Sequence, residues 1–401
     1  MTLFNRVRTW RALPLVVLLM AFATLLAACG GDDPTATATT APAPQSTATE
    51  AMSSDETAWE ELVAAAKAEG RIDMFACCNV SGQIAEINDA FTAKYGIEVV
   101  ASGGSPSKGV TRILSEREAG QKTLDLWING PVSGSRLING NALTSIKDML
   151  ILPEVRDTTD LLTGEWLYSD TANRELLIAF AVNARTADFV YNTNNLDPSE
   201  IMSYYDILDP KYKGKILIND PRQGQGGTPL AFMFTNPQIG KDWLTRLFTE
   251  MDVVVSSDLR QAAELLSRGD DFAVCLFGCS TEVELLKEQG LPVEDIFPTV
   301  PKEGTWGSAS PYFIGALEGA PHPAATQLYI NWYLSIEGQT LVQNLVKMDS
   351  VRTDIPKDAV LAGNRRQEGV DYFLFQFSAS YNDDLAEAQE FVKELIANMG
   401  G

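Results

Sequence analysis

Polar and glycine residues follow short apolar segments at several places in the sequence, where side-chain and backbone donors could bind an anion. The stretch 213–228 (KGKILINDPRQGQGGT) is the fullest example. Its apolar residues 216–218 have strand character, Asn219 and Asp220 end the strand, and glycines open the backbone before the next apolar segment. A polar turn between a strand and a helix presents free N–H groups, and open α/β sheets bind ligands at such turns. We therefore expect a binding site here, although the stretch names no reaction.

The candidate anion contacts combine small donors with two guanidinium groups. The planar fork of an arginine fits a carboxylate or a phosphonate, which makes Arg222 and Arg260 the candidate charge partners. Hydroxyl and N–H donors are expected from Ser105, Ser107, Gly227 and Thr228. The remaining binding candidates are residues at other predicted strand ends and two aromatic residues that could form cleft walls: Cys78, Asn79, Asn129, Asn219, Asp220, Ser256, Cys279, Ser280, Trp306 and Tyr312.

Each candidate also has a purely structural interpretation. Arg260 could pair with Glu264, one helical turn away, and Arg222 could cap a turn or pair with an acid at the surface. Serine and glycine are ordinary turn residues. Aromatic residues such as Trp127 are more often found in a core than in a cleft, and Arg352 could either reach the cleft or join two lobes.

Four cysteines besides Cys29 leave several pairings open: Cys77, Cys78, Cys275 and Cys279. An even number in an exported protein favours disulfides. A bond from Cys77 or Cys78 to Cys279 would link two predicted strand-end loops that lie about 200 residues apart in the sequence. The alternatives are a Cys77–Cys78 bond, a Cys275–Cys279 bond, a buried Cys275 thiol, or thiolate ligands for a soft metal.

The elements that must position these residues follow an α/β pattern. Strand, loop and helix alternate three times in the first part of the chain, with strands expected at 71–76, 97–101 and 124–128. This alternation predicts a parallel sheet with its loops along one edge. The strands are apolar throughout, as expected when helices cover both faces.

A second group of strands predicts a second lobe. Two long strands, 176–182 and 189–192, are expected to leave the first sheet, and further strands are expected at 216–218, 253–255 and 272–276. The expected fold is therefore α/β with two lobes, each a mostly parallel sheet flanked by helices, and a ligand cleft between them. Helices are expected to start near Thr57, which has capping-box spacing with Glu60, and to cover 241–250 and 323–335.

The N-terminus has the features of an export signal. Arg6, Arg8 and Arg11 precede an apolar run, 13–28, that is too short for a confident membrane span. The run ends in LAACG, which resembles a bacterial lipobox and implies that Cys29 becomes the lipid-modified first residue. An ordinary signal peptide with an incidental cysteine is the alternative. The Thr-, Ala- and Pro-rich segment 31–57 lacks apolar periodicity and is expected to be a flexible tether.

Composition and length fit an exported chain with two lobes. The formal net charge is −22, and removal of residues 1–28 with their three arginines would make it more negative. So acidic a chain is unsuited to nucleic acid or to a basic membrane-binding patch.

We expect a signal peptide at 1–28, a tether at 29–57, the first lobe with its first crossover at 58–183, the second lobe at 184–302, and a return to the first lobe with C-terminal helices at 303–401.

Several segments resemble the extracellular solute-binding proteins of ABC importers, in particular the ferric, or iron(III)-type, branch with the type 2 periplasmic-binding-protein fold. The segments are WEELVAAAKAEGRI, YNTNNLDPSEI, SYYDILDPKYKGKI, NDPR and HPAATQLYINWYLSIEGQ, and the resemblance covers 59 to about 356. It implies a monomeric, lipid-tethered receptor at the outer face of the cytoplasmic membrane. Such a receptor captures a small solute by cleft closure and delivers it to a permease and its ATPase, without a cofactor of its own.

The resemblance is weak for the solute. Ferric members of the branch use adjacent tyrosines after the strand that corresponds to 272–276, where this sequence has Cys279, Ser280 and Thr281. They also bring a histidine or an acid from the first strand-end loop, where Cys77, Cys78 and Asn79 stand. Serine and threonine supply no anionic ligand for ferric iron, a hard cation. We therefore expect no bare metal and favour an iron complex or an organic anion such as a phosphonate or carboxylate.

Two other functions remain possible on the sequence. A cysteine-dependent enzyme would need a base for Cys279, and the sequence places none beside it. His322 is the only histidine and lies between two prolines, where a structural role is expected. The sequence has no zinc-ligand spacing, nucleophile elbow or phosphate loop. A ligand-sensing module for a membrane receptor would share the fold and tether of an importer component.

Overall fold

The computed structural model describes residues 54–169, 175–185, 189–222, 226–269, 271–295, 300–378 and 380–399. These residues belong to one compact unit. The expected signal peptide, Cys29 and most of the expected tether lie outside the described residues, as do the side chains of Cys78 and Asn79. Within the described part of the chain, no helix combines the length and apolar character needed to cross a membrane.

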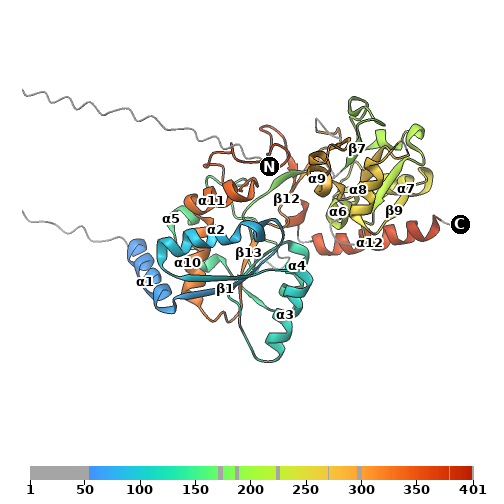
Figure 1. Cartoon of the computed structure of the whole chain (residues 1–401). Coiled ribbons are helices and arrows are strands. Elements are labelled where there is room, and N and C mark those ends of the chain that lie inside the picture. Colours follow the sequence, from blue (N-terminus) through green and yellow to red (C-terminus); the bar gives the residue numbers. More distant parts are fainter. Residues whose placement is uncertain are drawn as a thin grey trace, which may run out of the picture. The chain divides into compact units, whose positions relative to one another are not determined.

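The first lobe is built on a sheet with the strand order β2-β1-β3-β13-β4, and β5 pairs with β13 (Figure 1). β1 is parallel to both β2 and β3, whereas β13 is antiparallel to β3. Helices α2, α3 and α4 follow β1, β2 and β3, as the alternating pattern predicts. The bounds are β1 Arg71–Ala76, α2 Cys78–Tyr95, β2 Glu98–Ser102, α3 Pro106–Glu118, β3 Leu126–Asn129, α4 Pro131–Asn139, β4 Leu143–Thr144, α5 Pro153–Arg156, β5 Ile178–Ala179 and β13 Phe313–Leu317.

The second lobe has its own sheet, with the order β11-β7-β10-β8-β9. β8 is parallel to β9 and β10, and β7 is antiparallel to β10. The expected strands near 216, 253 and 272 are therefore present as neighbours. The bounds are β7 Val190–Asn192, β8 Ile216–Asn219, α6 Gly227–Thr235, α7 Gly240–Glu250, β9 Val254–Ser256, α8 Leu259–Ser267, β10 Val274–Leu276, α9 Val283–Glu288 and β11 Val293–Asp295.

Short strands, and not the two long strands expected from the sequence, connect the lobes. The apolar run 176–182 contributes only β5 to the first sheet, and 189–192 contributes β7 to the second. Between them, β6 (Asn183–Arg185) joins β12 (Thr305–Ser308) and β14 (Tyr372–Phe373) in a small sheet of order β14-β12-β6. The run 176–182 is divided because its residues bind two different backbone segments. The N–H of Phe180 donates to the carbonyl of Tyr312, whereas the N–H of Val182 donates to the carbonyl of Asp349.

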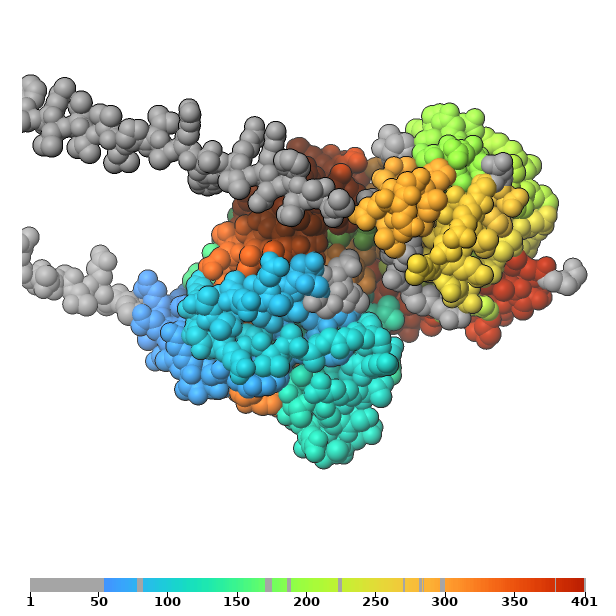
Figure 2. All heavy atoms as spheres, viewed as in Figure 1, coloured from blue at the N-terminus to red at the C-terminus, as the bar shows by residue number. Residues whose placement is uncertain are grey.

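The C-terminal part contributes to both lobes. α10 (Pro323–Leu334) packs against α1 (Ser54–Glu69), which starts before the expected Thr57 cap, and α11 (Ile336–Val346) packs against α2. The last helix, α12 (Tyr381–Asn398), instead packs against α6 and α7 of the second lobe, and its red residues lie beside yellow ones (Figures 1 and 2). Short 3-10 turns complete the described elements: Lys147–Met149, Pro198–Glu200, Tyr204–Leu208, Pro210–Tyr212, Cys279–Glu282 and η7, Phe375–Phe377.

Each lobe has a large apolar core of its own. The first-lobe core includes Trp127, Phe180 and Tyr312, and the second-lobe core includes Phe232 and Trp306. Tyr381 and Leu385 of α12 belong to the second-lobe core, which explains why this helix leaves the first lobe. A smaller cluster in the second lobe contains Cys275 and Cys279.

Candidate functional site

The carboxyl ends of the first sheet carry the candidates from the first lobe. Ser105 precedes α3, and its hydroxyl accepts a hydrogen bond from the N–H of Lys108 at 3.4 Å; both Ser105 and Ser107 are exposed. Asn129 ends β3 and is buried, and its Oδ1 accepts the N–H of Gly130 at 2.7 Å. Ser105 thus acts as a helix cap, whereas Asn129 keeps a donor nitrogen for another role.

The stretch after β8 forms a closed polar turn. Asn219 Nδ2 donates to the carbonyl of Phe277 at 2.8 Å, which ties the ends of β8 and β10. Arg222 binds the buried carboxylate of Asp220 through Nε and Nη2, both at 2.8 Å. The hydrogen bonds to Asp220 raise the pKa of Arg222. Arg222 therefore already neutralises a buried acid, as the ion-pair alternative predicted, although the acid is not at the surface.

The second arginine candidate also forms an ion pair within the protein. The Arg260 side chain is 74% exposed on α8, and its Nε lies 3.4 Å from Glu264 Oε1. This is the i,i+4 pair that the structural interpretation predicted. Ser256 ends β9 and its hydroxyl donates to the carbonyl of Asp258 at 2.9 Å. The charge of Arg260 is therefore paired with Glu264, and the hydroxyl of Ser256 is used within its own turn.

The cysteine pairing is decided for the second lobe. Cys275 and Cys279 form a disulfide, and both side chains are buried. Cys77 is also disulfide-bonded. A disulfide sulfur is not a thiolate, so the structure contradicts Cys279 as a nucleophile or soft-metal ligand, and Cys275 as a free thiol. Ser280, the neighbour of Cys279, is half-buried.

Replacing Cys275 and Cys279 together by alanine should lower the free energy of unfolding by about 2 kcal/mol. The reason is that a closed loop this short restricts the unfolded chain only modestly. Urea denaturation of the protein and the double variant measures the difference. An unchanged midpoint would show that the bond adds no stability.

The two aromatic candidates are core residues. Trp306 and Tyr312 are each 1% exposed. Trp306 packs on Phe232 in the second-lobe core, and the hydroxyl of Tyr312 accepts a hydrogen bond from Asn183 Nδ2 at 3.3 Å. The expectation that these rings line an open cleft is therefore not supported, since tertiary packing uses both.

Arg352 is paired within the first lobe and does not join the two lobes. It is 3% exposed, and its guanidinium donates to Asp354 and to the carbonyl of Glu154 within the first lobe.

Two polar residues near the strand ends were not predicted. Gln376 lies in η7, and its Oε1 accepts the N–H of Ala309 at 2.9 Å. Tyr381 starts α12, and its hydroxyl lies beside the side chains of Thr228 and Gln376. Gln376 and Tyr381 lie far along the chain from the residues that they approach, Ala309 and Thr228, and neither stands at a strand end. The strand–turn–helix pattern therefore could not indicate them.

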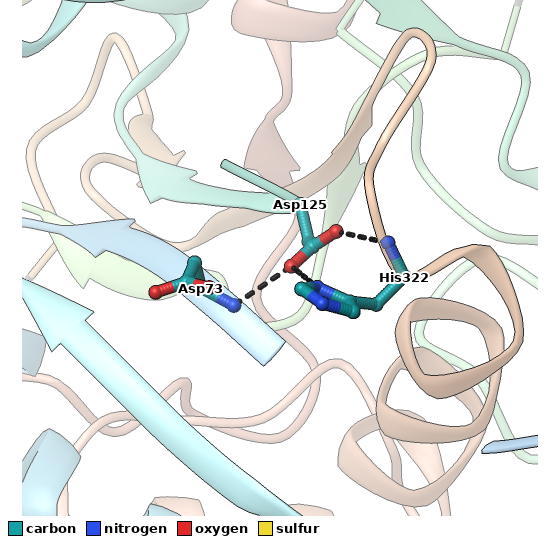
Figure 3. Close-up of side chains that lie close together, drawn as sticks. All are labelled: Asp73, Asp125 and His322. Atoms are coloured by element: carbon teal, nitrogen blue, oxygen red, sulfur yellow. Dashed lines mark hydrogen bonds and ion pairs between the residues drawn. The ribbon is translucent and has the colours of Figure 1, made fainter. Parts of the chain in front are cut away.

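His322 belongs to a different cluster, at the amino end of β3 (Figure 3). Asp125 is buried and accepts hydrogen bonds from the N–H of Asp73 at 2.7 Å and the N–H of His322 at 2.8 Å, and its Oδ2 lies 2.9 Å from His322 Nδ1. These residues could offer ligand atoms to a metal. However, Asp125 already serves three partners, and Asp73 is paired with Arg71. The cluster therefore has the arrangement of a structural helix start.

Comparisons with known proteins match this architecture. The family described as bacterial extracellular solute-binding proteins matches residues 86–360, more than half of the chain. The chain belongs to this family. A putative 2-aminoethylphosphonate-binding periplasmic protein of Salmonella typhimurium is 27% identical over 277 residues, which cover 67% of this chain and 74% of the relative.

Solved structures of this architecture share the fold. A Trichodesmium protein in complex with iron and citrate has a TM-score of 0.64 at 18% identity, over 81% of this chain and 99% of that one. The ferric iron-binding protein A of Mannheimia haemolytica, in an open conformation, has a TM-score of 0.61 at 14% identity, over 81% and 98%. The expected two-lobed type 2 periplasmic-binding-protein fold is confirmed.

The function follows at the level of the family. The protein is an extracellular or periplasmic solute-binding protein of the ABC-importer type. Proteins of this kind bind small solutes, work with a permease and an ATPase, and are generally transport components without enzymatic activity.

Proposed function

We propose that the protein is a lipid-anchored, monomeric receptor that captures a small organic anion between its lobes and delivers it to a permease. The observation that carries this proposal is the position of polar turns after parallel strands in both lobes. Asn129 ends β3, and Asn219 and Ser256 end β8 and β9. Ligands of open α/β sheets bind beyond the carboxyl ends of the strands, and two such edges can close on one solute.

An organic anion is a better candidate than bare iron. Positions 279–281, where the ferric branch is expected to have tyrosines, hold the disulfide-bonded Cys279 and two hydroxyl residues, none of which is an anionic oxygen ligand for ferric iron. The relative named for 2-aminoethylphosphonate supports a phosphonate as the first solute to test. Chelated iron, in which the chelator supplies the carboxylates, is the second. Catalysis is not part of the proposal, because Cys279 has no thiolate.

A thermal-shift screen tests the solute class. It would cover 2-aminoethylphosphonate, phosphate, citrate, ferric citrate, free ferric iron and dicarboxylates. A ligand that binds only the folded state raises the melting temperature by mass action. We expect a shift with one organic or phosphorus oxyanion. A shift with free ferric iron alone would contradict the anion class, and no shift with any member would contradict the proposed solutes altogether.

The proposed anchor rests on the LAACG segment and predicts a change in location for Cys29→Ser. Without the thiol that takes the lipid, the protein should move from the membrane fraction to the soluble or secreted fraction, since the lipid supplies the membrane affinity. Fractionation and mass spectrometry of the mature N-terminus measure this. Ser46→Ala, in the same proposed tether, should remain with the membrane. Equal membrane association of both variants would refute the anchor.

A further inference from the structure

Three buried side chains carry polar atoms that form no hydrogen bond of good geometry with the described residues. They are Nδ2 of Asn129 at the end of β3, Nε2 of Gln376 in η7, and the hydroxyl of Tyr381 at the start of α12. Their exposed fractions are 1%, 1% and 3%. A buried donor without an acceptor costs about 1–3 kcal/mol. Three of them in one region therefore call for an explanation.

These three residues are connected through one short segment, Ala309–Ser310. Gln376 Oε1 binds the N–H of Ala309. The N–H of Gly130 donates to Asn129. Gly130 lies against Ser310, because a Cβ added to Gly130 would be 2.8 Å from Ser310 Oγ. Tyr381 reaches the same place through its approach to Gln376.

Gln376 also lies where the two cores meet. Its neighbour Phe375 belongs to the second-lobe core, with its ring centroid 5.3 Å from that of Trp306. Its other neighbour, Phe377, packs against the first-lobe core, with its ring centroid 5.8 Å from that of Phe313. The backbone of η7 therefore holds Gln376 at the junction of the two cores, beside Ala309 and Tyr381.

The group is uncharged and offers two amide NH₂ groups and one phenol hydroxyl as donors, although the hydroxyl can also accept. Burial raises the pKa of Tyr381, so its hydroxyl stays protonated at neutral pH. Next to it, Thr228 stands in the first turn of α6, where the helix dipole favours negative charge. The guanidinium groups expected to bind an anion are instead paired with Asp220 and Glu264.

We propose that Asn129, Gln376 and Tyr381, together with the start of α6, bind the oxyanion group of the solute. The group would be a phosphonate, phosphate or carboxylate, whose oxygens only accept hydrogen bonds. Recognition would then depend on neutral donors of both lobes, and not on Arg222 or Arg260. This inference rests on the proposed function as an anion receptor.

Titration calorimetry with 2-aminoethylphosphonate, inorganic phosphate and citrate tests the assignment. Tyr381→Phe removes one hydroxyl, and it should weaken the affinity for the bound oxyanion about tenfold to a hundredfold. Asn129→Asp keeps Oδ1 for Gly130 but replaces the donor by a charged acceptor, so it should weaken binding at least as much. Tyr381→Phe keeps the ring that packs on Phe375, so the ligand-free variant should remain folded, and its melting temperature verifies this.

Tyr333→Phe is the matched control. Tyr333 is also fully buried, and its hydroxyl also has no partner among the described residues, but it lies on α10 in the first-lobe core. This variant should bind like the unmodified protein. If Tyr381→Phe and Asn129→Asp also bind like the unmodified protein, the donor assignment is wrong while the receptor function stands. If the unmodified protein binds none of the three oxyanions, the proposed function fails and the assignment fails with it.

Discussion

Asp349→Asn should lower the free energy of unfolding by about 3 kcal/mol, because it removes the buried counter-charge shared by one largely buried and one partly buried cation. Asp349 is 2% exposed, and its Oδ1 lies 3.0 Å from Nζ of Lys357 and 3.1 Å from Nη2 of Arg366. Its Oδ2 also accepts the N–H of Arg366 at 2.8 Å. Arg366 is the better buried partner, with a side chain 9% exposed, against 26% for Lys357.

This cluster fixes the C-terminal segment to the connection between the lobes. The N–H of Asp349 binds Asn183 Oδ1 of β6 at 2.8 Å, and the carbonyl of Asp349 accepts the N–H of Val182. Arg366 also donates to the carbonyl of Ser350 at 2.9 Å. Loss of the charge at Asp349 would therefore weaken the attachment of Val182 and β6, which lie in the connection between the lobes.

The pH dependence of the Asp349→Asn deficit is a further check on the cause. Burial lowers the pKa of Lys357, and the Asp349 carboxylate opposes that effect. In the variant the folded-state pKa of Lys357 falls further below its unfolded-state pKa. At pH values between these two pKa values the unfolded chain binds more protons than the folded chain. Stability then rises with pH in that window. The deficit should shrink as the pH approaches about 10, the ordinary pKa of lysine.

Urea denaturation at several pH values measures both effects. Glu250→Ala provides the control, since it removes an exposed i,i+4 pair with Arg246 whose side chains are 40% and 54% exposed. Exposed pairs of this kind contribute less than about 1 kcal/mol. A deficit for Asp349→Asn no larger than that of Glu250→Ala would show that the buried cations do not depend on Asp349.

The sequence predicts the strands that alternate with helices, because local signals bound them, but the antiparallel strands β4, β11 and β13 were not predicted. Gly70 precedes β1, Asp220 and Pro221 follow β8, and alternation with helices predicts parallel pairing. The connection between the lobes was not predicted, since the apolar run 176–182 has no internal breaker. Its division into separate pieces depends on partners such as Tyr312 and Asp349, which lie far along the chain.

The candidate site was predicted less well than the fold, for a physical reason. Strand-end residues such as Asn129 can be found from position alone. The pairing of a charged residue cannot be found in this way: Glu264 was visible as a possible partner of Arg260, but Asp220 was expected to bind the ligand and not Arg222. Gln376 and Tyr381 come close to Thr228 only through the packing of α12 on the second lobe. No local pattern marks that contact.

Asp125→Ala should destabilise the protein by about 2–5 kcal/mol, because it leaves buried N–H groups without acceptors. Asp125 is fully buried and receives the N–H groups of Asp73 on β1 and of His322 at the start of α10 (Figure 3). The same carboxylate contacts His322 Nδ1. One side chain thus connects two strands of the first sheet to the helix that covers them.

Asp125→Asn separates the acceptor role from the charge. An amide keeps one oxygen acceptor but offers an NH₂ group where the second oxygen was, so it should lose less stability than alanine yet remain below the unmodified protein. Urea midpoints of the three proteins, measured with and without Zn²⁺, give the order. If Zn²⁺ stabilised the unmodified protein but neither variant, Asp73, Asp125 and His322 would be metal ligands and the structural interpretation would be wrong. If the midpoints were the same for all three proteins, the hydrogen bonds to Asp125 would contribute nothing to the stability of the first lobe.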